Sequence, residues 1–85
     1  MSPSILTEAN DLIHGDRQAS YGHPRTNLDR VAALWSVPLG VTVTAEQVCL
    51  CMALLKIARQ VNKAKRDNLV DAAGYIALIE RLGEP

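Results

Sequence analysis

The sequence lacks several features that would point directly to a function. Lys and Arg together number nine, and so do Asp and Glu, so no net charge attracts nucleic acid, although a local basic patch remains possible. The N-terminal segment turns polar after Leu6, so it does not resemble a secretory leader. The apolar run at residues 48–55 is far shorter than the roughly 20 residues that cross a bilayer. These absences predict a cytoplasmic domain without a membrane partner.

Cysteine is also scarce, because Cys49 and Cys51 are the only two. Two residues apart on a helix, their side chains point about 200° from each other, so they cannot form a disulfide. A C-x-C pair inside an apolar run lacks the further ligands of a zinc site. We expect two buried free thiols. No Ser or Cys stands beside a base in a recognisable nucleophile motif, and no P-loop or dinucleotide fingerprint is present.

Residues 44–62 are the stretch around which the rest of the chain is organised. Thr44 and Gln47 have the spacing of a capping box, and residues 48–55 are apolar on every side of a helix. Such a helix has to be enclosed by other helices, by a second copy of the chain, or by both. A chain of 85 residues is one domain, 1–85, with a small core. We therefore predict a homodimer or a larger oligomer.

Three further helices follow from apolar residues at helical spacing. Ser2 and Pro3 resemble a helix start, which predicts a helix over residues 3–13. A second helix begins near Pro24 or Thr26 and ends at Pro38, with Trp35 on its core face. A last helix is capped by Asp67 or Asn68 and runs through Leu82. Residues 41–43 are a linker, so the fold class is all-α, a small four-helix unit without strands.

The basic end of the central helix is the first candidate site. Lys56, Arg59 and Lys63 recur at spacings of three and four, so they share one helical face. Asp67 and Asp71 lie four residues apart on the next helix. Two carboxylates on one face can hold Mg²⁺ together with a nucleotide. Alternatively, Asp67 caps its helix and Asp71 pairs with Lys56 or Arg59, which needs no metal.

Residues 14–25 form the second candidate site, predicted to be a loop rich in side chains that can bind phosphate. Arginine forks bind phosphate oxygens, histidines donate to them or move a proton, and a tyrosine can stack on a base. Alternatively, the tyrosine seals the bundle and the charges pair locally. The candidate ligand-binding residues of this loop are His14, Arg17, Tyr21, His23 and Arg25. We predict that they join Lys56, Arg59 and Asp71 in one anion-binding pocket, across or beside a subunit interface.

Three blocks carry a family resemblance: HGDRQASYGHPRTNLDRVAALWS, LLKIAR and RDNLVDAAGY. Together they resemble a family of small phage and prophage proteins of unknown function, and that family is more distantly similar to MazG-like nucleotide pyrophosphohydrolases. The resemblance implies a MazG-like helical bundle, an oligomer, a nucleotide ligand and the host cytoplasm as location. MazG-like enzymes hold Mg²⁺ through E-x-x-E and E-x-x-D, whereas this chain has Lys56 and Arg59 at the first motif and Asn68 and Asp71 at the second.

Three functions remain open from the sequence. The first is binding of a nucleotide or related phosphate ligand without turnover, with no cofactor. The second is Mg²⁺-dependent hydrolysis of a nucleoside triphosphate, with Asp67 and Asp71 as the only candidate metal ligands. The third is a helical interaction module that binds a host or phage protein.

Overall fold

The computed structural model describes the chain from residue 3 to residue 84, except for the side chains of Asp16, Arg17 and Gln18. The described residues form helices and no strand, which confirms the all-α prediction. Four long helices are present as expected, and a short fifth lies within the predicted loop. The helices are α1 (Ile5–His14), α2 (Asp16–Tyr21), α3 (Pro24–Leu39), α4 (Ala45–Asn62) and α5 (Arg66–Arg81).

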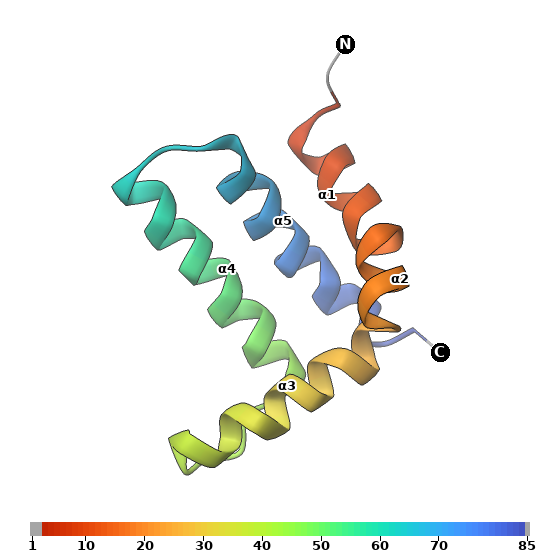
Figure 1. Ribbon diagram of the computed structural model, residues 1–85, viewed down its shortest axis with the longest axis vertical. Coiled ribbons are helices and arrows are strands. Elements are labelled where there is room, and N and C mark those ends of the chain that lie inside the picture. Colours follow the sequence, from red (N-terminus) through yellow and green to blue (C-terminus); the bar gives the residue numbers. More distant parts are fainter. Residues whose placement is uncertain (1–2, 85) are drawn as a thin grey trace.

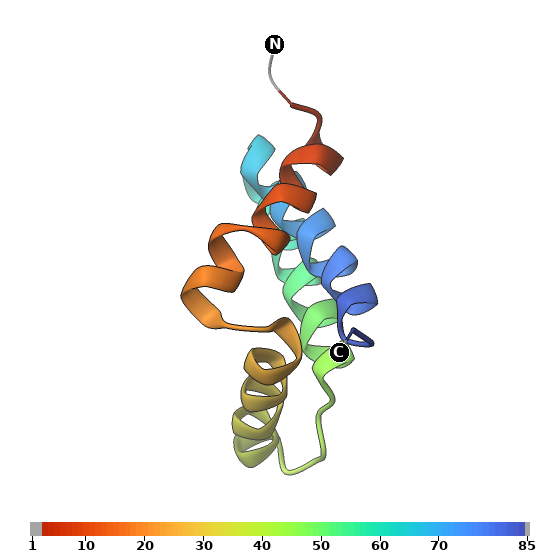
Figure 2. The same ribbon diagram turned by 90° about the vertical axis from the view of Figure 1, so that its right-hand side faces the viewer.

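Helices α1, α5 and α4 lie side by side in one layer, with α5 in the middle (Figure 1). Helix α3 crosses the end of this layer, and the view turned by 90° shows how thin the layer is (Figure 2). The extents of the Cα atoms are 44 × 33 × 19 Å, so the shortest dimension is about that of two packed helices.

The core lies where α1, α3, α4 and α5 meet. Val48 and Cys49 of α4 are its most buried side chains, at 1% and 0% exposure. Trp35 packs against this cluster from α3, as predicted. Buried Arg81 donates from Nη1 to the Ile13 carbonyl oxygen at 2.5 Å, and Arg66 pairs with Glu8 at the opposite end of α1 and α5. These contacts hold α1 and α5 together at both ends.

Helix α4 begins as predicted. The Thr44 hydroxyl accepts from the Gln47 backbone N–H at 3.1 Å, and the Gln47 side chain accepts from the Thr44 N–H at 2.9 Å. Only part of the apolar run is enclosed, because Val48 and Ala53 are buried whereas Leu54 is 62% exposed. The prediction of two buried thiols is wrong for Cys51, which is exposed. The 200° between the two cysteines lets only one of them face the core.

Several predicted boundaries need correction. Helix α1 starts at Ile5 because the Ser4 hydroxyl caps it through the Thr7 N–H, whereas Ser2 lies outside the described residues. Pro38 lies inside the last turn of α3, and the helix ends at Leu39, followed by the C-cap Gly40, whose φ of 68° reverses the chain.

The start of α5 also differs from the prediction. The N-cap is Lys65, without a side-chain cap, rather than Asp67 or Asn68. Asn68 does not cap the helix. Its side-chain amide donates to the Gln60 side-chain oxygen at 3.2 Å and to the Lys63 carbonyl oxygen at 3.4 Å, so it holds the start of α5 against the end of α4.

The predicted loop over residues 14–25 is mostly helical. Helix α2 fills its middle, where Ala19 N–H bonds back to the Gly15 carbonyl at 3.1 Å. Gly22, with a φ of 80°, then breaks the helix before His23 caps α3. Periodicity failed to predict α2 because a helix of 6 residues is too short to repeat an apolar position.

Candidate functional site

A basic groove lies between the C-terminal half of α4 and the N-terminal half of α5. It has a volume of about 590 Å³, and its lining carries four cations against two carboxylates. The structure thus brings together Lys56, Arg59 and Asp71, as the sequence predicted. The charged residues that line the groove are Lys56, Arg59, Lys63, Lys65, Asp67 and Asp71.

One ion pair crosses this groove. Lys56 Nζ lies 3.2 Å from Asp71 Oδ2, and both side chains are partly buried, at 16% and 25% exposure. Asp71 therefore pairs with Lys56, one of the two partners expected. Arg59 is exposed, and in the described part of the chain no carboxylate lies within ion-pair distance of it. Its guanidinium is therefore available to an anion.

The first turn of α5 opens at the same groove. Because Lys65 provides no side-chain cap, the first N–H groups of α5 have no hydroxyl or carboxylate acceptor from their N-cap. Helix N-termini of this kind favour anions through their free N–H groups and the helix dipole. Asp67 opposes this preference, since its carboxylate lies in the same turn. The groove retains a net excess of two positive charges.

The residues of the predicted loop are placed elsewhere. His14 ends α1 and its Nδ1 is 2.9 Å from the Asn10 carbonyl, and Arg25 forms an exposed ion pair with Asp29 at 3.0 Å. The Arg17 side chain lies outside the described residues. Helix α2 packs beside α1 and α3, and within the described chain none of its Cα atoms lies within 8 Å of a Cα atom of α4 or α5. A single chain therefore does not bring His14 or Arg25 to the basic groove.

His23 lies at the start of α3 and stabilises it. Its Nδ1 accepts from the Arg25 backbone N–H at 3.1 Å, which caps α3. Accepting at Nδ1 leaves the proton on Nε2. That nitrogen is buried, and within the described residues it has no hydrogen-bond partner. His23 therefore fixes the entry into α3.

Tyr21 lines a second cavity, of about 280 Å³, which is mainly apolar. Tyr75 of α5, Met52 of α4 and Asn27 of α3 line the same space. Tyr21 is 59% exposed, so it does not seal the bundle, and its ring is available at the rim of the cavity. Sequence reasoning missed Asn27 and Met52 here. Met52 precedes Lys56 by one helical turn, and that spacing could have placed it on the face of the basic stripe.

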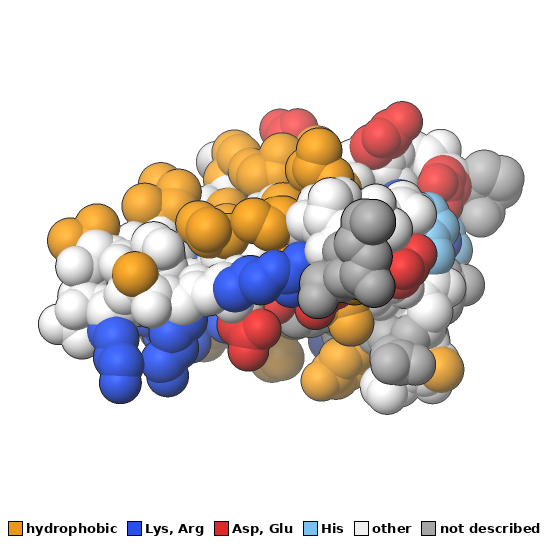
Figure 3. All heavy atoms as spheres, turned by 90° about the horizontal axis from the view of Figure 1, so that it is seen from above, with side chains coloured by type: hydrophobic (Ala, Val, Ile, Leu, Met, Phe, Trp, Pro, Cys, Tyr) orange, Lys and Arg blue, Asp and Glu red, His pale blue; other side chains and the backbone are white. Residues whose placement is uncertain are grey.

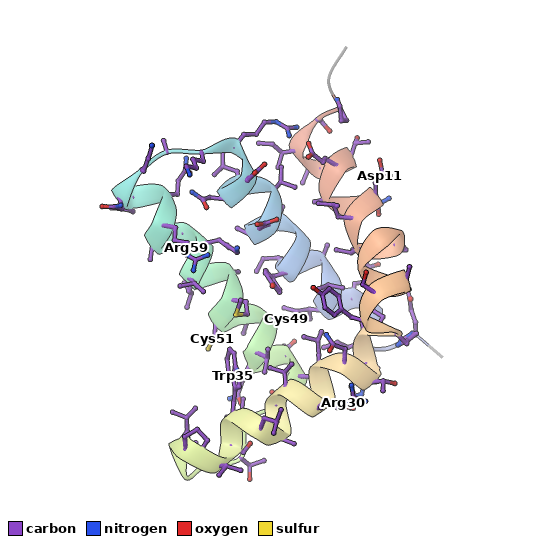
Figure 4. All side chains as sticks on the ribbon, in the orientation of Figure 1. Asp11, Arg30, Trp35, Cys49, Cys51 and Arg59 are labelled. Atoms are coloured by element: carbon purple, nitrogen blue, oxygen red, sulfur yellow. The ribbon has the colours of Figure 1, made fainter. Side chains whose placement is uncertain are left out.

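The two cavities follow one another along the same side of the α4–α5 pair. On α4, Met52, Lys56, Arg59 and Lys63 are spaced by four, three and four residues, which keeps them on one face. On α5, Tyr75 lines the apolar cavity and Asp71, one turn away, lines the basic groove. Figure 4 shows Arg59 on the part of α4 away from α3, whereas Trp35, Cys49 and Cys51 lie where α4 approaches α3.

Magnesium, which the distant resemblance implies, does not fit these side chains. Lys56 and Arg59 stand on α4 where carboxylates would be needed, and Asp71 already pairs with Lys56. Within the described residues, no three His, Cys, Asp or Glu side chains lie close enough to hold one ion together. Cationic neighbours repel Mg²⁺, which prefers carboxylate and phosphate oxygens.

Cys49 is poorly suited to act as a nucleophile. Burial, and secondarily the negative charge of Glu46, raises the pKa of this thiol from 9.0 to about 11. The reactive form of cysteine is the thiolate, so at neutral pH Cys49 is inert.

Among the described helices, none is both long and apolar enough to cross a membrane.

Comparison with known proteins identifies relatives among phages. The chain is 45% identical to the Gene 55 protein of Mycobacterium phage D29 over 85 residues, covering 99% of this chain and 56% of that protein. It is 43% identical to the Gene 55 protein of Mycobacterium phage L5 over 84 residues, covering 54% of that protein. The chain thus spans about half the length of these curated relatives. No solved structure matches it.

The family model for a domain of unknown function, DUF6378, matches residues 4–83. This match takes in the loop, the basic groove and all five helices. The chain therefore belongs to the DUF6378 family.

Proposed function

We propose that this chain binds a nucleotide or a related phosphate compound along the α4–α5 groove, without turnover. The observation that carries the proposal is the succession of an apolar cavity and a basic groove on one side of the same helix pair. A nucleotide has the same two parts, a flat ring and a chain of phosphates. From Met52 to Lys63 the helix rises roughly 16 Å, at about 1.5 Å per residue, which is long enough for both parts.

The phosphates would bind at the basic end. Arg59 is an exposed guanidinium that can bind phosphate oxygens with two parallel hydrogen bonds. Lys63 and Lys65 add charge at the rim, and the open first turn of α5 adds backbone donors. Lys56 is paired with Asp71, so it contributes positive charge to the groove rather than a free hydrogen-bond donor.

The ring would enter the apolar cavity. Tyr21 and Tyr75 offer aromatic faces, and Met52 provides an adaptable wall. Asn27 supplies an amide that can donate and accept, which suits the edge of a base. The cavity volume of about 280 Å³ is near the lower end for small-molecule sites.

The absence of turnover follows from the side chains at the phosphate end. The resemblance to MazG-like enzymes supports a helical nucleotide site, but their hydrolysis depends on carboxylates that hold Mg²⁺. Here the corresponding residues Lys56 and Arg59 are cations. The groove has the charge to hold a phosphate chain and no evident group to activate water.

Calorimetric titration with nucleoside mono-, di- and triphosphates tests this proposal. Arg59→Ala should weaken binding at least about tenfold, since a charge-assisted bond contributes about 1.5–3 kcal/mol. Arg30→Ala is the matched control, because Arg30 is also exposed but lies on α3, well away from the groove (Figure 4). Absence of binding, or equal losses in both variants, would refute the proposal. Rapid release of pyrophosphate with Mg²⁺ would favour the MazG-like enzyme instead.

A helical interaction module is the second candidate function. It is supported by the large apolar side chains that α4 exposes, including Leu54 at 62% and Val61 at 84%. Such exposed groups commonly mark binding surfaces. Capture of a defined host or phage protein that is lost in Leu54→Asp, together with no nucleotide binding, would select this function.

A further inference from the structure

The outer face of α4 carries an apolar stripe with the spacing of a helix-pairing seam. We use the name outer seam for Leu50, Leu54, Ile57 and Val61, which are 42%, 62%, 52% and 84% exposed. Their spacing of four, three and four residues is that of the a and d positions of a heptad. At about 100° per residue, the stripe is centred roughly 120° around α4 from the buried face formed by Val48, Cys49 and Ala53. Helix α4 thus carries an exposed apolar face beside its buried one.

The flatness of the chain explains why this seam is uncovered. Domains are built from at least two packed layers, whereas α1, α5 and α4 lie side by side in one layer and α3 crosses only its end. Figure 3 shows hydrophobic side chains gathered along one side of the molecule, with Lys and Arg projecting from the other side at its left-hand end. Within the described chain the seam therefore borders solvent.

The charges at the two ends of α4 indicate what covers the seam. Glu46 lies in the first turn, and the connection after the last turn carries Lys63 and Lys65. In an antiparallel pair of identical helices, the acidic end of each copy lies beside the basic end of the other. A parallel pair would instead place like charges together at both ends, and its helix dipoles would repel.

We propose that a second copy of this chain packs antiparallel on the outer seam. Leu54 of each copy then meets Ile57 of its partner near the twofold axis, and Leu50 meets Val61. Cys51 and Ala58 flank the seam seven residues apart and are both exposed, so small side chains allow the two helices to approach closely. The isologous contact buries the apolar side chains that one copy leaves exposed.

Sedimentation equilibrium across the micromolar range tests the proposal. The native chain should be a dimer, and Leu54→Glu should raise its dissociation constant at least about 100-fold, because it buries a charge at the seam. The monomer should stay helical by circular dichroism, since Leu54 is exposed in the single chain. Val61→Lys provides a second disruption at the far end of the seam.

Leu6→Glu is the matched control, because Leu6 is 75% exposed on α1 and away from the seam. It should leave the dissociation constant unchanged. A native chain that is monomeric would overturn the proposal. So would an outer seam that is covered by another protein or by a further segment of a longer chain. A Leu54→Glu dimer as tight as the native one would overturn it as well.

Charge exchange tests the antiparallel arrangement separately. Glu46→Lys should weaken the dimer several-fold by placing like charges together, and adding Lys65→Glu should recover most of the loss. A parallel pair would show no loss with Glu46→Lys alone, because one like-charge contact would replace another. An unchanged dissociation constant in Glu46→Lys would therefore overturn the antiparallel arrangement.

Discussion

The two halves of α4 both carry apolar side chains but have different surroundings. In the N-terminal half, Val48, Cys49 and Ala53 are buried where α1, α3, α4 and α5 meet. In the C-terminal half, Ile57 and Val61 face solvent, and the side toward α5 carries the ion pair of Lys56 and Asp71. The difference shows that one helix can form the core at one end and expose apolar and charged side chains at the other.

The largest effect that distinguishes the two halves is expected from a buried carboxylate. Val48→Asp should abolish folding, because a charge buried without a partner costs several kcal/mol in a domain whose total stability is about 5–15 kcal/mol. Ile57→Asp, in the exposed half, should leave a folded monomer. Urea unfolding followed by circular dichroism measures both, and a stably folded Val48→Asp would contradict the assignment of the core.

Removing the N-cap hydroxyl of α4 should have a smaller effect on stability. Thr44→Ala should lower the free energy of unfolding by about 1 kcal/mol, the usual value of an N-cap hydroxyl. Thr42→Ala, in the preceding linker, is the control and should change little. Equal losses in the two variants would show that the capping box does not stabilise α4.

The ion pair in the other half should contribute less to stability than to binding. Lys56→Gln and Asp71→Asn should each lower stability by at most about 1 kcal/mol, because the pair is partly solvated. Their effects on nucleotide affinity should have opposite signs, since one removes a cation from the groove and the other an anion. Calorimetry of both variants measures this, and losses of affinity in both would refute the anion-binding groove.

The smallest effect is confined to alkaline pH. The pKa of Cys49 is raised from 9.0 to about 11, so the folded chain holds this proton more tightly than the unfolded chain does. The resulting stabilisation is complete below pH 9 and is lost as the pH rises through about 11. Thermal unfolding across this range should show a shallower pH dependence in Cys49→Ala than in the native chain.

Cys51→Ala is the control for this measurement. Cys51 is exposed, so its replacement should leave the alkaline loss of stability as in the native chain. The same steep loss in Cys49→Ala would assign the pH dependence to other groups.

Sequence patterns predicted the parts of the fold that depend on neighbouring residues. The Thr44 capping box, the Trp35 core face and the pairing of Asp71 with a basic residue of α4 depend on spacings of three or four residues, or on a short connection between helices. Helix α2 and the start of α5 were not predicted, because one is too short to show periodicity and the other lacks a side-chain cap. The apolar run wrongly predicts a buried Cys51, because a run of apolar residues does not indicate which side of the helix faces inward.

The sequence by itself determined that the chain is helical, where α4 begins, and that Lys56, Arg59 and Lys63 share one face. These properties follow from local propensity, capping and the helical repeat. The tertiary structure decided that the His14 and Arg25 side chains lie apart from that face, that Met52 and Tyr75 extend it into an apolar cavity, and that the outer seam is left exposed. Such facts depend on how helices distant in the sequence pack, and helical periodicity carries no information about that packing.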